Sequence, residues 1–282
     1  MVFRILFWIS KIEVLGLNMN KKIKILKLGG SLLTDKNKPF SLRKDVINNV
    51  IEQIIKSKEK LILIHGGGSF GHPLAKQYNI IEGPNSEIKD QILGLVKTHN
   101  AMVEFNNYII KQFIDRNIPV ISLQPSSLFF KIGNEIIFNS INLLETILNL
   151  NIMPILYGDI IFSSKKSFSI ISGDEIIVEL CKHIKNYRIT KVIFAIETDG
   201  IYIQNDKGIK SLLKNINFTD LNNIKLANLD KKIDVTGGIK FKLNKIRQIV
   251  SLKIPVQIIN GLKPEYVYNA LKDKEITSTY IY

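Results

Sequence analysis

The sequence is poor in the features that mark secreted, metal-binding and membrane-embedded chains. Its one cysteine, Cys181, excludes an internal disulfide and leaves no pair of cysteines for a metal site. The mostly apolar run from Phe3 to Ile9 is too short to cross a bilayer, and no clear small-residue cleavage site follows it. These absences predict a cytoplasmic protein with no membrane partner.

The chain also lacks the features that divide a protein into several domains. It has no internal repeat, no low-complexity linker and no proline-rich hinge. Residues 1–18 differ from the rest, whereas Met19 to Lys22 looks like a natural start directly before the first predicted strand. We therefore expect residues 1–18 to be a disordered tail or the product of an upstream start codon, and residues 19–282 to form one domain.

Basic residues are in excess, but they form no block interleaved with aromatic residues. The formal net charge is +14 at pH 7 and the isoelectric point is near 9.6. Such a charge suits a nucleic-acid-binding protein, an enzyme acting on anionic ligands, or a proteome rich in Lys and Asn. Because Lys and Asn recur on predicted strands and helices alike, we favour the compositional explanation and expect no nucleic-acid partner.

Short apolar runs alternate with helical patterns from residue 23 onward. Runs typical of buried strands cover residues 23–28, 61–64, 120–123, 153–157, 192–196 and 256–259. Helical patterns cover residues 43–56, 87–116, 141–149, 174–184 and 238–252. This alternation predicts an α/β fold with a mostly parallel central sheet that is covered on both faces.

Glycine-rich or polar clusters follow several of the predicted strands. They are residues 29–31, 66–72, 158–159 and 198–200. Because the carboxyl ends of parallel strands meet at one edge of a sheet, and ligands bind there, we expect these clusters to form one site.

The first cluster combines Lys27 with Gly29 and Gly30, and Lys36 follows shortly after. Glycines let the backbone approach a ligand closely, so that N–H groups can point at phosphate oxygens. A lysine beside them offers a positive charge to a phosphoryl group in transfer. A plain turn with a surface lysine is the alternative for this cluster taken alone.

The second cluster, His65 to His72, contains three consecutive glycines, which destabilise a chain unless a turn or ligand requires them. Glycines between a strand and a helix N-terminus form an anion site through free N–H groups and the helix dipole. The cluster is neither a Walker A loop nor a dinucleotide-binding fingerprint. His65 suits a structural hydrogen bond as well as a ligand contact, and an imidazolium at His72 could hold an anionic acceptor.

Two further clusters supply carboxylates and lysines. Gly158 precedes Asp159, and Asp174 stands at a predicted helix start, where it could cap the helix, orient nearby lysines, or do both. The segment from Asp234 to Lys242 contains a Gly-Gly turn that opens a helix, which suits nucleotide phosphates. A capped helix with solvated lysines is the alternative for that segment.

From Met19 onward the sequence closely resembles the archaeal-type isopentenyl phosphate kinases of the amino acid kinase superfamily. The resemblance rests on ordered motifs at residues 25–31, 65–72, 121–127, 171–174 and 234–242. It implies an open αβα sandwich, with an acceptor-binding N-terminal lobe and a nucleotide-binding C-terminal lobe. It also implies transfer of the ATP γ-phosphoryl group to isopentenyl phosphate, with Mg²⁺ and a homodimeric assembly.

The resemblance further implies roles for single residues, which we state as expectations. Catalysis would use Lys27, Lys36, His72 and Asp174. The nucleotide would contact Lys27, Gly29, Gly30, Gly68, Asp199, Gly238 and Lys242. The acceptor would contact Gly66, Gly67, His72 and Gly158, and no residue is expected to bind a metal directly. The helix around Ala101, Met102 and Phe105 would cover the isoprenoid tail.

Some features leave other functions open. The residues Glu197 to Gly200 depart from the family's usual Asp-Val-Asp-Gly pattern next to the nucleotide, which leaves the base preference open. A fosfomycin kinase-like enzyme or another phosphorus-oxyacid kinase would share the same chemistry. A non-catalytic nucleotide-binding or nucleic-acid-binding protein is the alternative of another class, although it leaves the lysine, glycine and histidine set unexplained.

Overall fold

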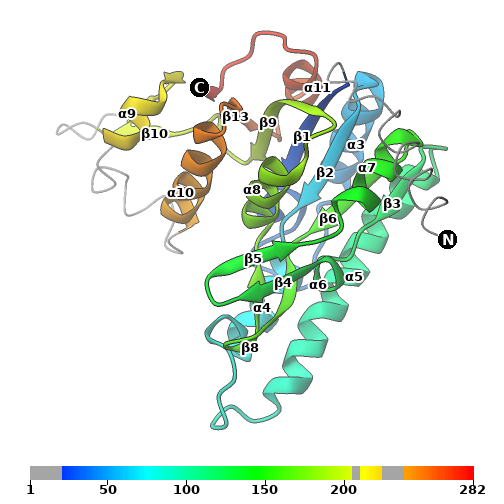
Figure 1. The fold of residues 1–282 in the computed structure, drawn as a ribbon. Helices are drawn as coiled ribbons and strands as arrows, with labels where there is room; N and C mark the ends of the chain where they lie inside the picture. The colour runs from blue at the N-terminus through cyan, green and yellow to red at the C-terminus, as the bar shows by residue number, and fades with distance from the viewer. Residues whose placement is uncertain (1–20, 205–209, 224–237) are drawn as a thin grey trace, which may run out of the picture.

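The computed structural model describes residues 21–204, 210–223 and 238–282. At its centre lies an eight-stranded sheet with the order β12-β14-β13-β9-β1-β2-β6-β3 (Figure 1). Every pairing in this sheet is parallel except that of β13 with β14. Its strands are β1 (Lys22–Leu28), β2 (Leu61–His65), β3 (Val120–Ser122), β6 (Met153–Tyr157), β9 (Arg188–Ile196), β12 (Asn215–Ile216), β13 (Val256–Asn260) and β14 (Thr279–Ile281).

Alternating side chains of the central strands feed two separate cores. On β1, Ile23 and Ile25 point into one core, whereas Leu26 and Leu28 point into the other. The first core is completed by α7 (Ile141–Asn149), α8 (Gly173–His183) and α10 (Gly238–Ser251). The second is completed by α3 (Lys44–Ser57), α5 (Gln91–Ile114) and α11 (Tyr266–Leu271). The predicted αβα sandwich with a mostly parallel sheet is therefore confirmed.

A smaller four-stranded sheet, which the sequence did not predict, extends from the central one. Its order is β5-β4-β7-β8, with β4 (Phe129–Ile132), β5 (Glu135–Phe138), β7 (Asp159–Ser163) and β8 (Ser167–Ile171). Strand β7 begins one residue after Gly158, directly beyond the end of β6. The smaller sheet therefore continues the chain from the edge where the site was expected.

The remaining elements are short. They are α2 (Gly30–Leu33), α4 (Gly68–Gln77), η1 (Ile80–Glu82), α6 (Pro125–Leu128), β10 (Tyr202–Gln204), β11 (Lys210–Leu212) and α9 (Phe218–Asn223). Among the helices in the described part of the chain, none combines the length and the apolar character needed to cross a membrane.

The starts of β9 and α5 differ most from the predicted boundaries, whereas the other predicted elements agree more closely. Strand β9 begins at Arg188, where it pairs with Lys22 of β1. Arg188 is polar and precedes the apolar run from which the strand was predicted. Helix α5 begins at Gln91 rather than Glu87, because Asp90 has a left-handed backbone with φ of 56°. Backbone pairing and one left-handed residue therefore set boundaries that the apolar pattern alone misplaces.

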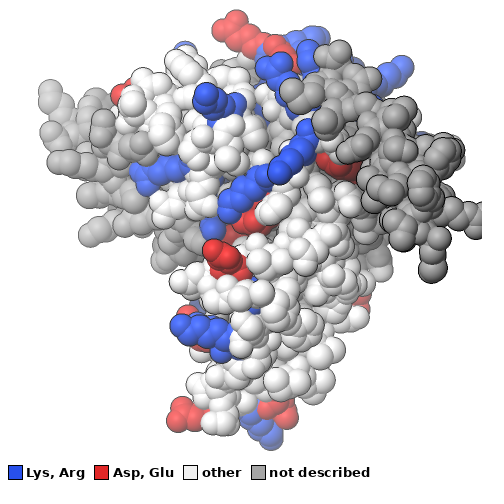
Figure 2. Space-filling model, viewed as in Figure 1, with Lys and Arg blue, Asp and Glu red and all other residues white. Residues whose placement is uncertain are grey.

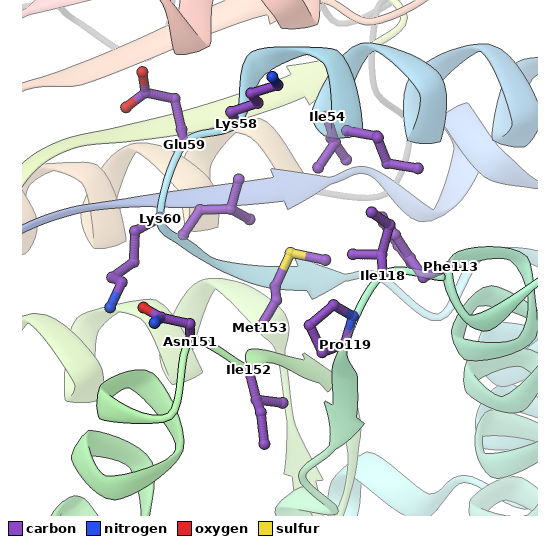
Figure 3. A pocket seen from close by; sticks show the side chains of 12 residues that line it. Ile54, Lys58, Glu59, Lys60, Phe113, Ile118, Pro119, Asn151, Ile152 and Met153 are labelled. Carbon is purple, nitrogen blue, oxygen red and sulfur yellow. The ribbon is translucent and has the colours of Figure 1, made fainter. Parts of the chain in front are cut away.

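A cavity of about 290 Å³ lies at the edge of the sheet where β2, β3 and β6 begin (Figure 3). Its apolar lining includes Ile54, Phe113 and Met153, and Lys58 and Lys60 border it. The predicted site residues follow the opposite, carboxyl ends of the strands and none of them lines this cavity.

Candidate active site

Two glycine turns meet where β1 and β2 end. A Cβ atom on Gly30 would lie 2.2 Å from the backbone nitrogen of Gly68, and one on Gly66 would lie 2.7 Å from the nitrogen of Gly30. Gly68 itself has φ of +50°, a left-handed backbone that glycine adopts without strain. The structure thus brings together the first two predicted clusters, in a contact too close for any side chain.

Hydrogen bonds lock this contact and position the loop that carries Lys36. The Thr34 hydroxyl donates to the carbonyl of Gly30 over 2.8 Å and accepts from the backbone N–H of Ser69 over 2.9 Å. The carbonyl of Ser69 would pair with residue 73 within α4, but Pro73 has no N–H to donate. The backbone N–H of Phe40 takes that place over 3.1 Å, which ties the loop to α4.

A buried charge cluster lies beside the glycine turns. The side chain of Lys27 is only 8% exposed and its amine forms an ion pair with the Asp174 carboxylate. The other oxygen of Asp174 lies 3.4 Å from the amine of Lys242 on α10. Both amines lie over the ring of Phe194, at 5.8 and 5.1 Å from its centroid. Three predicted site residues from distant parts of the chain are therefore in contact.

Burial and charge shift the pKa values of this cluster in ways that suit a phosphate site. Burial lowers the pKa of Lys27 to about 8 against the opposing attraction of Asp174. The pKa of Asp174 falls to about 2, because the two lysines outweigh the burial that would raise it. Asp174 is thus ionised. The pKa of Lys27 is lowered in the free protein, and a bound phosphate would raise it again.

The structure corrects one interpretation of Asp174. The residue that caps α8 is Ser172, whose hydroxyl accepts from the backbone N–H of Glu175 while the Glu175 carboxylate accepts from the backbone N–H of Ser172. This capping box satisfies the helix start without Asp174. The Asp174 carboxylate, two residues after Ser172, is therefore available to the two lysines.

The predicted residues Lys36 and Asp199 both lie in ion pairs. The Lys36 side chain is 67% exposed and its amine lies 3.2 Å from Glu197, whose other oxygen lies 2.7 Å from Arg43. Asp199 forms an ion pair of 2.7 Å with Lys263. The unusual Glu197 is thus neutralised by two cations, an arrangement that the sequence did not reveal.

The two histidines of the second cluster differ sharply. His65 is fully buried, its ring stacks near Tyr157, and burial lowers its pKa to about 4. His72 reaches solvent on the first turns of α4, and a Cβ on Gly67 would lie 3.4 Å from its ring. Partial loss of hydration, followed by repulsion from Lys27 and Lys36, lowers the pKa of His72. His65 is therefore structural, and the lowered pKa of His72 disfavours its imidazolium form before an anion binds.

Gly158 lies beside the same cluster, at the end of β6. Its backbone N–H donates to the carbonyl of His65 over 3.1 Å, and a Cβ on it would lie 3.7 Å from the nitrogen of Gly173. Gly173 in turn lies against Lys27, because a Cβ there would be 3.1 Å from the lysine side chain. Gly158 therefore lies beside the charge cluster of Lys27, Asp174 and Lys242.

The helix expected to cover an apolar tail contributes its small and apolar residues to the core. Ala101, Met102 and Phe105 are all buried, and the ring of Phe105 stacks on Phe70 with centroids 4.8 Å apart.

His99 on the same helix, which was not among the predicted site residues, contacts the buried carboxylate of Asp159. A histidine on an otherwise apolar helix face and an acidic residue after a strand were the available signals.

The last predicted segment lies partly outside the described residues. Asp234 to Gly237 lie outside the described residues, and Gly238 is the first residue of α10. Lys242, one turn further on, reaches Asp174 and so joins this helix to the charge cluster.

Comparison with known proteins places these observations in a family. The sequence pattern of the amino acid kinase family matches residues 22–260. Isopentenyl phosphate kinase from Methanocaldococcus jannaschii is 38% identical over 256 residues, covering 88% of this chain and 94% of the relative. Isopentenyl phosphate kinase from Methanothermobacter thermautotrophicus is 31% identical over 268 residues, covering 91% and 98%.

Solved structures agree with the sequence comparison. A crystal structure of an isopentenyl phosphate kinase superposes with a TM-score of 0.78 at 27% identity, covering 92% of this chain and 100% of the other. A substrate complex of an isopentenyl phosphate kinase gives a TM-score of 0.74 at 26% identity, with coverage of 93% and 100%. UMP kinase from Ureaplasma parvum, at 16% identity and a TM-score of 0.62, shares the fold.

The contact between the glycine turns gives a prediction about stability. We expect Gly68→Ala to lower the free energy of unfolding by about 3 kcal/mol, since its Cβ would lie 2.2 Å from the Thr34 hydroxyl oxygen. Gly133→Ala is the matched control, because Gly133 has φ of +58° but no atom within 4 Å of its Cβ position. That variant should lose only about 1 kcal/mol.

Both variants can be compared by equilibrium unfolding in denaturant. Equal losses in the two would mean that the left-handed backbone, not the close contact between the turns, is what requires glycine at position 68.

Proposed function

Because the chain belongs to the amino acid kinase family, as one of its isopentenyl phosphate kinases, we propose that it transfers the γ-phosphoryl group of ATP to isopentenyl phosphate. The products are isopentenyl diphosphate and ADP. The observation that carries the proposal is the buried contact of Lys27 and Lys242 with Asp174, beside the two glycine turns. Two buried amines balanced by one carboxylate leave a positive site, which suits the phosphates of two anionic substrates.

The proposed chemistry depends on positioning and charge, not on a protein base. An oxygen of the acceptor phosphate already carries negative charge, so it can attack the γ-phosphorus directly while the bond to the bridging oxygen of ADP breaks. Lys27 would neutralise the charge that builds up on the transferring group. Asp174 would hold Lys27 and Lys242 in place. Lys36 is exposed and lies near Glu197. It would approach the transferring phosphoryl group from the solvent side.

The acceptor phosphate would lie on the second glycine turn. Gly66 and Gly67 would offer the backbone of this turn, and Gly158 lies beside Gly173, which contacts Lys27. His72 would donate a hydrogen bond to the acceptor phosphate, whose negative charge would raise the lowered pKa of this histidine. The histidine would therefore gain a proton as the acceptor binds.

The nucleotide would occupy the side formed by β1, β9 and α10. Gly29 and Gly30 border that side directly, and Gly29 already donates its N–H to Ala195 of β9 over 2.9 Å. Gly68, Asp199, Gly238 and Lys242 complete the proposed nucleotide contacts. We further propose that Lys36 and Arg43 keep Glu197 from repelling the phosphates, which lets this acidic residue stand beside them.

Magnesium would enter this site with ATP, where it would neutralise phosphate charge. Among the residues that the structure describes, no group of three or more His, Cys, Asp or Glu side chains could hold a metal ion. Asp174 is occupied by two lysines. The donor set therefore fits a metal held chiefly by the nucleotide phosphates, not by a protein cage.

We propose a division of labour along the chain and a homodimeric assembly. The N-terminal part would bind the acceptor and the C-terminal part would bind the nucleotide. The enzyme would act in the cytoplasm.

The homodimer is supported by Phe130 and Ile132 on β4 and Phe162 on β7, which are exposed apolar neighbours on the smaller sheet. Figure 2 shows few charged side chains where Figure 1 places β4 and β5. Light scattering after gel filtration measures the mass, and a monomer at micromolar concentration would contradict the assembly.

The proposed function is tested by a substrate panel. Isopentenyl phosphate, dimethylallyl phosphate, fosfomycin and UMP are each offered with ATP, and kcat/KM is compared. We expect isopentenyl phosphate to be the preferred acceptor. Preference for fosfomycin would favour the alternative oxyacid kinase. Tight, salt-sensitive binding of RNA or DNA without any ATP turnover would favour the non-catalytic alternative.

The lowered pKa of Lys27 predicts the alkaline side of the pH profile. Lys27 is charged below its pKa of about 8 and neutral above it, so kcat/KM should fall as the pH rises through that value. Lys27→Arg keeps a positive charge throughout and, if active, should lose this decline. The profile is measured between about pH 6 and pH 10. A decline that is the same in both proteins would assign it to another group.

The position of His72 predicts a graded effect of substitution. His72→Ala should lower turnover at subsaturating isopentenyl phosphate by about tenfold or more, since a hydrogen bond to a charged group is lost. His72→Gln should retain part of the turnover, because its amide can still donate. Initial rates of the two variants give the comparison, and wild-type turnover in His72→Ala would remove His72 from the acceptor site.

A further inference from the structure

One face of α5 contacts three separate parts of the proposed acceptor site. His99, Met102 and Asn106 follow one another at spacings of three and four residues, which places them on one side of a helix. The Asn106 Oδ1 atom accepts a hydrogen bond from Nε2 of the His65 ring over 3.2 Å. The Met102 sulfur lies 3.4 Å from the Cβ position of Gly67. This helix therefore supports both the end of β2 and the glycine turn that follows it.

The third contact on this face is an ion pair with a buried carboxylate. The Nδ1 atom of His99 lies 2.9 and 3.1 Å from the two oxygens of Asp159, whose side chain is 0% exposed. The same carboxylate accepts from its neighbour Ile160 over 2.8 Å and from the backbone N–H of Ser126 over 3.3 Å. Asp159 thus joins α5, α6 and the start of β7, directly beside Gly158.

The charge of His99 matters because Asp159 is withdrawn from water. A buried carboxylate without a cation is costly, and the two backbone N–H groups compensate for only part of its lost hydration. The hydrogen bond with Asp159, opposed by partial burial, raises the pKa of His99. The Tyr157 hydroxyl also interacts with Asp159, and its pKa is raised mainly by burial, so that it stays neutral.

We propose that His99 is a positioning residue for the acceptor. Its imidazolium holds the Asp159 carboxylate and thereby fixes the backbone at Gly158, where the acceptor phosphate is proposed to bind. This inference rests on the proposed function. It assigns to His99 a role in acceptor affinity, without contact to either substrate and without a part in nucleotide binding.

Three variants separate the charge from the hydrogen bond. His99→Ala removes both, whereas His99→Asn keeps a donor near the position of Nδ1 without the charge. Asp159→Asn removes the charge from the other partner. His183→Asn is the matched control, because His183 is a half-exposed histidine at the far end of α8 whose ring contacts the carbonyl of Glu179 over 2.8 Å.

Steady-state kinetics with each substrate varied in turn provides the main readout. We expect His99→Ala to raise the KM for isopentenyl phosphate about tenfold while the KM for ATP changes less than about twofold, since displaced backbone weakens only the acceptor site. His99→Asn and Asp159→Asn should raise the same KM. The control should leave both KM values unchanged, and circular dichroism checks that each variant is folded.

The pH dependence adds a readout that a purely structural role would not change. In the wild type, the KM for isopentenyl phosphate should rise as the pH passes upward through the raised pKa of His99, because the cation is lost. In His99→Asn the rise should be smaller, and what remains should come from His72 and Lys27. NMR titration shows whether the pKa of His99 lies above those of His65 and His72, as expected, since the hydrogen bond with Asp159 raises the first and burial lowers the other two.

The possible failures give different results. If the wild type does not phosphorylate isopentenyl phosphate, the proposed function fails and this inference fails with it. If the wild type is active but His99→Asn and Asp159→Asn keep the wild-type acceptor KM and its pH dependence, the function stands and the role of His99 is wrong. Equal increases in both KM values would also overturn it, because they would indicate a general loss of structure.

Discussion

The arrangement of the site depends on the absence of side chains where the turns after β1 and β2 meet. Atoms of Gly30, Gly66 and Gly68 occupy the space in which a Cβ would otherwise lie. Because the turns touch backbone to backbone, the ends of the two neighbouring strands can present N–H groups to one small volume. Thr34, which bonds to both turns, keeps them in register. Lys27, Asp174 and His72 take their places around that volume.

Electrostatic balance is the second constraint on the molecule. Lys27 and Lys242 together carry one more charge than Asp174 neutralises, and all three are largely withdrawn from water. Burial lowers the pKa of Lys27, and repulsion from Lys242 adds to this effect against the attraction of Asp174. Phosphate groups entering the site would relieve the excess of positive charge. The same imbalance that costs stability in the free protein therefore favours the binding of anionic substrates.

The sequence predicted much of this arrangement, because its local patterns carry the information. Runs such as Leu61 to Ile64 followed by glycines were enough to place strands, turns and the edge where they meet. Pairings between residues far apart in the chain carry no such pattern. The contact of Lys27 with Asp174, 147 residues apart, followed only from the family resemblance, and that of His99 with Asp159, 60 residues apart, was missed.

The smaller sheet was missed for a related physical reason. Its strands have four or five residues each, and β4 and β5 are joined by a tight turn at Gly133 that follows the exposed apolar residues Phe130 and Ile132 of β4. Neither length nor alternation distinguishes them from a loop in a chain rich in Ile and Phe. The pairing of β4 with β7 joins segments about thirty residues apart in the chain, and no local pattern indicates it.

Pro73 has a consequence for how the loop bearing Lys36 can vary between related chains. Since the missing N–H of Pro73 leaves the Ser69 carbonyl to the backbone of Phe40, the height of that loop over α4 is set by main-chain atoms. Main-chain bonds are indifferent to side-chain identity. The residues from Asn37 to Pro39 can therefore differ in sequence, while the base of the loop and the neighbouring Lys36 stay where they are.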